Sequence, residues 1–484
     1  SLQIDYAAIA PELILTAVLC GVLLLDLVLP KERKWLAMPA AFLGVLVTLG
    51  AVLWLATGPD RTTLGGMFVV DRFAVLFKVL FSLAALIVFA ISHDYLKDDD
   101  IHQGEYYTLM LSSLLGMLVI ASSRDLIPIF VALELISLPA FVLAGLRKSD
   151  IRSNEAALKF FLFGVLSTAV MLFGMSLIYG ITGTTDLAKI SVVLAATPVF
   201  RSIALLSIFF IIVGFGFKIS AFPFQWWVPD TYEGSPVPVA AFLSVASKTA
   251  GFVGLLQVMF IAFGGLADVW RPFLALLAVL TMTFGNLVAM QQKHLVRLLA
   301  YSSIGQAGYI LLPLGIASAT DRSLNHQAMM ASITYLLIYA FMETGAFAAV
   351  IAVGRRGGGY MLDNYAGLFT RSPGLAIGMT VFLFSLAGVP PFAGWAAKLF
   401  VFLAVIKSGY IWLAIAMALN TVIALFYYAL VVKRMFIDKA TQGEPIIKVP
   451  PLISTAIAVS AIVVLLIGVL PDLFAKIAAA SSLL

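Results

Sequence analysis

The chain has 484 residues, of which 62% are hydrophobic and only 11% are charged, and its formal net charge is +5. A soluble domain usually has about 45 to 50% apolar and about 25% charged residues, so this composition excludes a water-soluble globular protein. One cysteine excludes a disulfide framework, and the scattered Lys and Arg residues form no basic stripe for nucleic acid. The sequence therefore predicts an integral membrane protein with no nucleic-acid partner.

Fourteen segments approach or exceed the roughly 20 apolar residues that a helix needs to cross about 30 Å of hydrocarbon. Because backbone polar groups in lipid must be paired internally, and the sequence lacks the alternating pattern of a barrel, we expect an all-α membrane bundle. The predicted spans are Leu13–Leu29, Leu36–Ala56, Met67–Ser92, Tyr107–Ala121, Leu126–Leu146, Ala156–Ile181, Ile203–Trp226, Val237–Phe263, Pro272–Met290, Leu298–Ala317, Met329–Val353, Leu375–Ile406, Tyr410–Val432 and Leu452–Val469.

Lys and Arg residues are distributed unevenly between the two sides of this predicted bundle. The odd-numbered connections hold 16 of them, and the even-numbered connections together with the C-terminal tail hold 8. Because Lys and Arg collect in cytoplasmic connections, the odd connections are predicted to be cytoplasmic and both termini to lie outside.

The remaining six basic residues lie inside the predicted spans: Arg72, Lys78, Lys159, Lys218, Lys248 and Lys398. A charged side chain in a bilayer costs about 3 kcal/mol or more, so it usually faces protein or water and marks a pathway. For Arg72 and Lys78, close to Asp71, snorkelling or a structural ion pair is the favoured interpretation. Lys159 is one turn into its helix, which leaves an interfacial position open. The three deeper lysines are candidate pathway residues.

Four acidic residues also fall in the predicted spans: Asp71, beside Arg72, and three others. Glu134 stands in the middle of the fifth span, in VALELISLP, and is the acid most clearly placed at mid-membrane depth. For Glu343, in YAFMETGAF, a pathway role and a structural role are equally open. Asp26, near the end of the first span, is predicted to be interfacial or at a subunit contact.

Prolines interrupt two of the spans, and each interruption has a lysine beside it. Lys218 is followed by Pro223 in the seventh span, and the pair Pro390 and Pro391 precedes Lys398 in the twelfth. Proline removes a backbone donor and clashes with the preceding turn, so both helices are predicted to be discontinuous. The ends of half-helices at membrane depth carry partial charge and need protein or water as partners.

The two breaks lie five helices apart, which predicts two five-helix repeats of inverted topology. The predicted boundaries are an N-terminal three-helix segment at 1–104, a first repeat at 105–264, a second repeat at 265–434 and a C-terminal helix at 435–484.

Lysine, carboxylate and water suffice to carry protons. Burial disfavours the charged form of a lysine and a nearby carboxylate favours it, so movement of the partner loads and unloads a proton. A Na⁺ site would prefer several carboxylates and carbonyls, so the sequence favours H⁺. We find no catalytic or metal-ligating pattern: His93, His102, His294 and His326 lack i, i+4 pairing. GFGF at Gly214 is interpreted as helix packing, and GRRGGG at Gly354 as a flexible connection.

Four segments resemble the antiporter-like membrane subunits of respiratory complex I, a family related to multi-subunit cation/proton antiporters, and within it the subunit N branch. They are KFFLFGVLSTAVMLFGMSLIYGITGT, FKISAFPFQWWVPDTYEGSPVPVAAFLSVASK, RLLAYSSIGQAGY and SLAGVPPFAGWAAKLFVF. The resemblance implies a 14-helix fold with broken seventh and twelfth helices and a hydrated polar axis in the membrane plane. By correspondence, the proton-transfer residues would be Glu134, Lys159, Lys218, Lys248 and Lys398.

The resemblance also implies roles, partners and a location. Glu134 and Lys218 would form a pair that Lys159 modulates, whereas Glu343 replaces a commonly neutral residue. No cofactor is expected in this chain; NADH, FMN, iron–sulfur clusters and quinone would belong to other subunits. The expected partners are neighbouring antiporter-like and small membrane subunits and lipids. The expected location is a bacterial inner membrane, with both termini periplasmic.

The mechanism that follows is indirect. Quinone reduction elsewhere in the complex would alter electrostatics or hydration at one end of the axis, and protons would then move through the lysines. Three alternatives remain open: an Mrp-type cation/proton antiporter, a subunit of a membrane-bound hydrogenase, and a membrane scaffold whose lysines only form ion pairs.

Overall fold

The computed structural model describes residues 4–99, 101, 103–197, 199, 201–439 and 446–483. Thirteen helical segments of this described part are long and apolar enough to cross a membrane. The remaining predicted span, the twelfth, consists of two 15-residue helices separated by a break. The prediction of an α-helical membrane bundle is therefore confirmed.

The N-terminal segment contains a small hairpin that the hydrophobic pattern did not predict. Helices α1 (Ala10–Val28), α2 (Ala37–Ala56) and α3 (Arg72–Asp98) are its spans. Strands β1 (Arg61–Thr63) and β2 (Phe68–Val70) pair antiparallel between α2 and α3. The third span was predicted from Met67, but it begins at Arg72, because the apolar residues before it form β2.

The next spans contain the first break. They are α4 (Gln103–Ser122), α5 (Leu126–Ala144), α6 (Ile151–Thr182) and α8 (Arg201–Ile219), with the short helix α7 (Leu187–Ala196) before α8 and the short helix α9 (Trp227–Gly234) after it. The eighth span is α10 (Val237–Phe242), a π-turn η4 (Leu243–Ser247), α11 (Lys248–Gln257) and a second π-turn η5 (Val258–Ala262).

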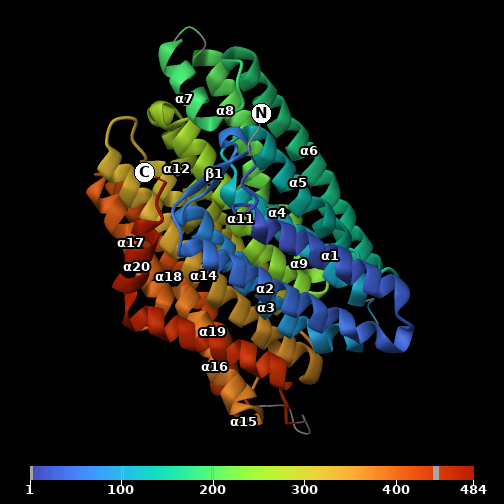
Figure 1. Cartoon of the computed structure of the whole chain (residues 1–484). Coiled ribbons are helices and arrows are strands. Elements are labelled where there is room, and N and C mark those ends of the chain that lie inside the picture. Colours follow the sequence, from blue (N-terminus) through green and yellow to red (C-terminus); the bar gives the residue numbers. More distant parts are fainter. Residues whose placement is uncertain are drawn as a thin grey trace.

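The remaining spans contain the second break. They are α12 (Ala267–Ala289), α13 (Leu295–Leu311), α14 (Arg322–Arg356), α16 (Pro373–Ala387), α17 (Ala393–Lys407), α18 (Ile411–Phe436) and α19 (Pro451–Val469), with short helices α15 (Leu368–Arg371) and α20 (Pro471–Ala480). In Figure 1, helices α5 to α8 gather at one end of the molecule, and α15 to α20 gather at the other.

Aspartate side chains define where several helices begin, because each accepts a hydrogen bond from an otherwise unpaired amide of the first turn. The capping residues are Asp71, Asp125, Asp150, Asp186 and Asp321. In this way short polar connections fix the register of long apolar helices that have little amphipathic character of their own.

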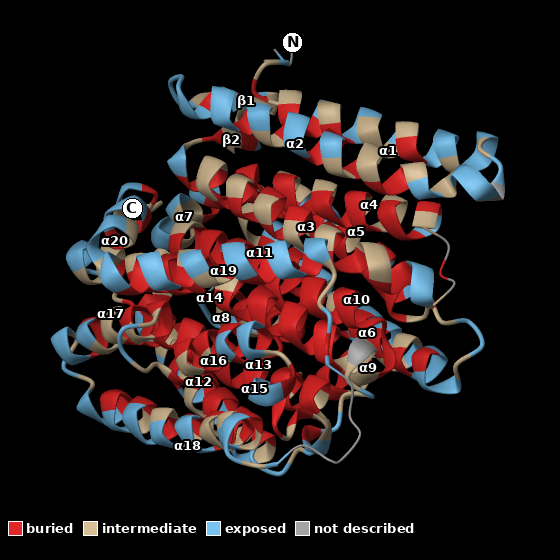
Figure 2. Cartoon of the chain, turned by 90° about the horizontal axis from the view of Figure 1, so that it is seen from below, coloured by how far each residue is buried: buried red, intermediate tan, exposed pale blue. Residues whose placement is uncertain are grey.

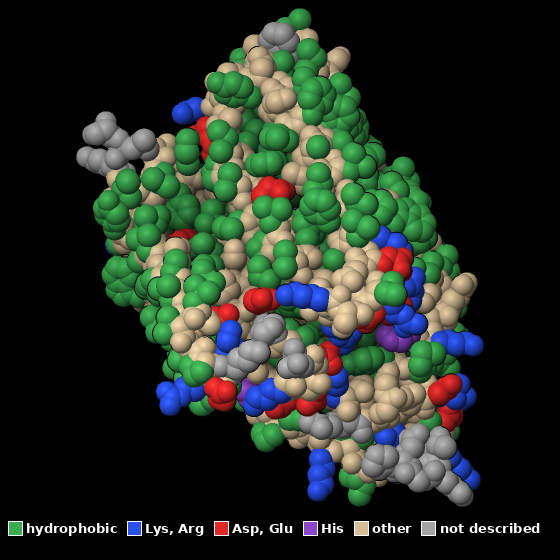
Figure 3. Space-filling model, turned by 90° about the vertical axis from the view of Figure 1, so that its right-hand side faces the viewer, with side chains coloured by type: hydrophobic (Ala, Val, Ile, Leu, Met, Phe, Trp, Pro, Cys, Tyr) green, Lys and Arg blue, Asp and Glu red, His purple; other side chains and the backbone are tan. Residues whose placement is uncertain are grey.

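Burial follows a centre-to-edge gradient (Figure 2). In the most apolar stretch of each helix, 100% of the residues are buried in the eighth span and 94% in α14, but only 22% in α1. The exposed residues of the outer helices are largely apolar, for example Leu24, Leu166 and Val422. Figure 3 shows a face on which hydrophobic side chains cover a broad area while charged side chains gather toward one end. This surface matches a hydrocarbon environment.

Ion pairs tie several odd-numbered connections together. Asp99 at the end of α3 pairs with Arg147, 2.9 Å away, and with Arg355 at the end of α14. Arg434 and Asp363 lie 3.9 Å apart on the same side. GRRGGG was interpreted as a flexible connection, but Gly354 and Arg355 belong to the last helical turn of α14.

Candidate proton-transfer site

The break of the seventh helix places Lys218 inside the bundle. Helix α8 ends at Ile219, and α9 begins only at Trp227, so the predicted discontinuity is confirmed. Lys218 is buried in the last turn of α8, and its Nζ donates a hydrogen bond to Ser137 Oγ of α5 at 2.9 Å. Gly251 of α11 packs on the same side chain, since a Cβ there would lie 2.8 Å from Lys218 Cγ.

Glu134 lies one turn before Ser137, on the same face of α5. It is half-buried, and it is near enough to Lys218 to act on it electrostatically. Among the described residues, however, Glu134 makes no ion pair, and the Lys218 ammonium is held by the neutral Ser137 hydroxyl. The structure therefore brings Glu134 and Lys218 into one neighbourhood without direct contact.

Lys248 follows the π-turn η4, a distortion that is frequent at functional sites. Its Nζ donates hydrogen bonds to Ser303 Oγ at 2.8 Å and to the Ser303 carbonyl at 2.9 Å. Ser244 lies one turn earlier on the same helix face and donates to Glu343 Oε1 of α14 at 3.0 Å. One continuous helix face thus holds a buried lysine and contacts a buried acid.

Glu343 is fully buried and interacts electrostatically with Lys248. Tyr339 OH lies 2.9 Å from Ser244 Oγ, within hydrogen-bond distance, so Ser244 contacts both Tyr339 and Glu343. Glu343 is therefore a second acid, fully buried, beside one of the candidate lysines.

The break of the twelfth helix holds Lys398. Helix α16 ends at Ala387 and α17 begins at Ala393, which confirms the second predicted discontinuity. Lys398 Nζ donates to the Ala387 carbonyl at 2.9 Å, where the end of α16 carries negative partial charge. The ammonium also lies over the ring of Tyr309, 4.6 Å from its centroid.

Uncharged polar side chains connect the surroundings of Lys248 with those of Lys398. Ser302, next to Ser303, shares a hydrogen bond with Tyr428 OH. Gln306 Nε2 lies 3.4 Å from Tyr428 OH and donates to the carbonyl of Leu386 at 3.1 Å, one residue before Ala387. Sequence reasoning missed these residues, although helical spacing places Ser302 and Gln306 on one face of α13.

Lys159 lies in a different environment from the other lysines. Its Nζ is 2.6 Å from Asp230 Oδ2 and 2.6 Å from Glu155 Oε1. Arg297 of α13 also reaches Asp230, at 2.8 Å, and Glu233, at 2.9 Å. We call these five residues the α9 ion cluster, because Asp230 and Glu233 belong to α9. The structure places Lys159 in this part-exposed cluster, not beside Lys218.

Of the charged residues at the start of α3, Lys78 and the N-cap Asp71 form separate ion pairs, and Arg72 forms none with any described residue. Lys78 is fully buried and lies 2.7 Å from Glu12 of α1, so it forms a structural ion pair, although not with Asp71. Asp71 lies 2.6 Å from Arg124. Asp26 pairs with Lys34 at 3.0 Å at the edge of the bundle.

No group of three or more His, Cys, Asp or Glu side chains within the described ranges has the arrangement of a metal site. His102 lies outside the described residues. Gly214 packs against Met171, as the packing interpretation of GFGF predicted.

The broken helices and buried lysines define an antiporter-like membrane protein, and comparison with known proteins identifies the family. A family model described as NADH:quinone oxidoreductase/Mrp antiporter, TM, matches residues 123–424, a range that includes all the candidate residues. The chain belongs to this family, in its branch of NADH-quinone oxidoreductase N subunits.

Similar proteins extend over nearly the whole chain. NADH-quinone oxidoreductase subunit N of Trichlorobacter lovleyi is 39% identical over 480 residues, covering 98% of this chain and 96% of that one. Subunit N 2 of Rhizobium meliloti is 40% identical, covering 98% and 97%. A chain of respiratory complex I from Thermus thermophilus with bound aureothin is 31% identical, with a TM-score of 0.81, covering 98% and 100%.

A more distant structure shares the fold alone. A chain of the Mrp complex from Dietzia sp. is 19% identical with a TM-score of 0.86, covering 99% of this chain and 97% of that chain.

Proposed function

We propose that this chain is a proton-translocating subunit of a bacterial NADH-quinone oxidoreductase. The observation that carries the proposal is the set of buried lysines held by neutral groups: Lys218 by a serine hydroxyl, Lys248 by Ser303, and Lys398 by a helix-end carbonyl. A lysine in a tight buried ion pair cannot lose its proton without leaving an uncompensated charge. A lysine with neutral partners can exist in both protonation states.

The first step concerns Glu134 and Lys218. Approach of the Glu134 carboxylate stabilises the Lys218 ammonium, and separation favours release of its proton. In this structure the ammonium is held by Ser137, which is the separated arrangement. Quinone reduction in another part of the complex would shift the balance between the two arrangements.

Protons then pass along the membrane plane. Lys248 and Glu343 form the central proton-binding site. From there, Ser302, Tyr428 and Gln306 supply hydrogen-bonding groups toward Lys398. A hydroxyl can donate and accept at once, so such groups suit proton relay.

Lys159 acts on this pathway through α9. Its ion pair with Asp230 fixes the half-helix that follows the break beside Lys218. Loss of this ion pair would let α9 and the break move, which gives Lys159 a physical route by which to modulate the Glu134 and Lys218 pair.

The larger arrangement is part of the proposal. The segments 105–264 and 265–434 are inverted repeats, each with a broken helix and a lysine at the break. Both termini are periplasmic, and the odd connections face the cytoplasm. H⁺ is favoured over Na⁺, because Glu134 and Glu343 lie in separate neighbourhoods and not in a cluster of carboxylates. NADH, FMN, iron–sulfur clusters and quinone bind other subunits, so this chain performs no redox chemistry.

The test is proton pumping during NADH-driven quinone reduction in membranes that carry Lys218→Ala, with assembly measured on the same sample. We expect an assembled complex whose pumping and turnover both fall sharply. Lys189→Ala, an exposed lysine on α7, is the matched control and should pump normally. Normal pumping by an assembled Lys218→Ala complex would contradict the proposal.

A further inference from the structure

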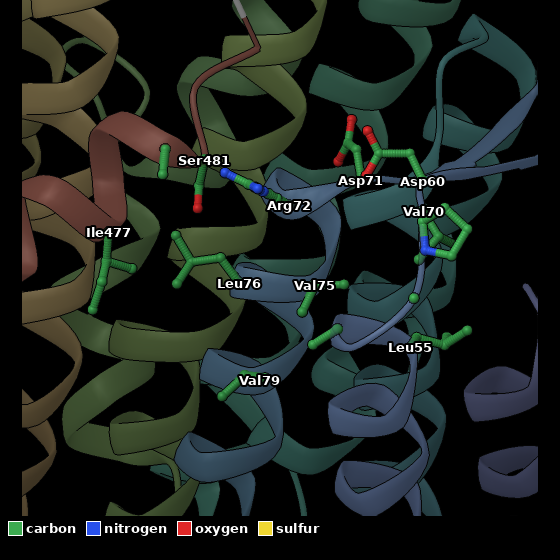
Figure 4. A pocket seen from close by; sticks show the side chains of 14 residues that line it. Leu55, Asp60, Val70, Asp71, Arg72, Val75, Leu76, Val79, Ile477 and Ser481 are labelled. Atoms are coloured by element: carbon green, nitrogen blue, oxygen red, sulfur yellow. The ribbon is translucent and has the colours of Figure 1, made fainter.

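A cavity of about 660 Å³ lies between the start of α3, the hairpin connection and the C-terminal helix α20. Its two ends differ in chemistry. Figure 4 shows the charged groups of Asp60, Asp71 and Arg72 at one end, with apolar side chains continuing along α3. Val75 and Val79 line one wall, and Ile477 of α20 lines the other.

The position of this cavity relative to the membrane follows from the helices that form it. Arg72 is the first residue of α3, so the charged end lies where the span meets water. From Arg72 to Val79 the apolar wall descends along α3 by seven residues, roughly 10 Å at the helical rise. The cavity is therefore amphipathic along the membrane normal, as a phospholipid is.

Three charged residues lie at the polar end of the cavity, and they differ in whether they already have partners. Asp71 already has two, because its carboxylate accepts from Ala74 N and lies 2.6 Å from Arg124. Arg72 and Asp60 are exposed, and neither forms an ion pair with any described residue. One free guanidinium and one free carboxylate thus remain at the rim.

We propose that this cavity binds a zwitterionic phospholipid whose headgroup carries a primary ammonium. Arg72 donates to the phosphate, as guanidinium groups do in phosphate sites. Asp60 accepts from the ammonium, and an acyl chain lies along the α3 wall against Ile477. The lipid would join the N-terminal segment to the C-terminal helix, two parts of the chain that are more than 400 positions apart in sequence.

The test uses the assembled complex in nanodiscs with equal amounts of phosphatidylethanolamine and phosphatidylglycerol. Leu76, which lines the cavity, is replaced by the photoreactive p-benzoyl-phenylalanine, and adducts are identified by mass spectrometry after illumination. We expect an adduct with phosphatidylethanolamine. Arg72→Gln and Asp60→Asn should each reduce it about tenfold, since each leaves an amide that can still hydrogen-bond but removes the charge that strengthens the contact with the headgroup.

Arg322→Gln is the matched control. Arg322 is also an exposed residue that begins a span directly after a capping aspartate, Asp321, but it does not line the cavity. It should leave the adduct unchanged. Equal capture of phosphatidylglycerol, an adduct with a neighbouring subunit, or capture that does not depend on Asp60 and Arg72 would each overturn the proposal.

Discussion

Gly388 gives the sharpest test of how the twelfth-helix break holds its lysine. Its φ is +90°, and a Cβ added there would lie 2.8 Å from Lys398 Cδ. In Gly388→Ala the left-handed backbone costs about 1–2 kcal/mol. The forced contact adds about 1–3 kcal/mol if the lysine does not move. Displacement of Lys398 from the Ala387 carbonyl is the relaxation that the geometry offers.

Gly409 separates these two effects. It also has a positive φ, +81°, but no heavy atom lies within 4 Å of the position its Cβ would take. Gly409→Ala therefore carries the backbone cost alone. We expect both variants to lower the thermal stability of the complex, and only Gly388→Ala to lower proton pumping per NADH oxidised. Equal pumping by the two assembled variants would refute the view that the break positions Lys398 for proton transfer.

Two further predictions concern the buried acids. Glu343→Gln keeps an oxygen for Ser244 but removes the negative charge near Lys248. Proton pumping should fall about tenfold if about 1.4 kcal/mol of stabilisation is lost, whereas Glu32→Gln, at an exposed position, should not change it. Pumping by Glu343→Gln equal to that of Glu32→Gln would make Glu343 a structural residue. Glu12→Leu leaves the fully buried Lys78 unpaired and should destabilise the fold by about 3–5 kcal/mol; adding Lys78→Met should restore most of the thermal stability without affecting pumping, and a double variant as unstable as the single one would contradict this reading.

The spans and the two breaks could be predicted because their causes are local. Runs of apolar residues define a span, and Pro223 and the pair Pro390 and Pro391 disfavour continuation of a helix through local steric and hydrogen-bonding effects. The hairpin could not be found in this way. Phe68 to Val70 is as apolar as the helix that follows, and only pairing with Arg61 to Thr63 makes it a strand.

The partners of the charged residues depend on tertiary contacts between distant helices. Lys159 meets Asp230, which is 71 positions away, and Lys218 meets Ser137, which is 81 positions away. Burial of Glu343 likewise depends on the helices packed around α14. The sequence therefore indicated which residues carry charge in the membrane, whereas the pairing between them required the structure.

The contrast between two kinds of buried lysine explains why helix interruptions matter for function. Lys78 sits inside an unbroken helix, whose carbonyls are already paired, so a carboxylate from α1 must balance its charge. At a break the last carbonyls of a half-helix have no intrahelical partner, and Lys398 takes one of them. Such a carbonyl carries only partial charge, and it can accept a hydrogen bond from water or a neighbouring hydroxyl when the lysine is neutral. The unbroken helix around Lys78 thus favours a fixed ion pair, whereas the break beside Lys398 permits a lysine whose proton can come and go.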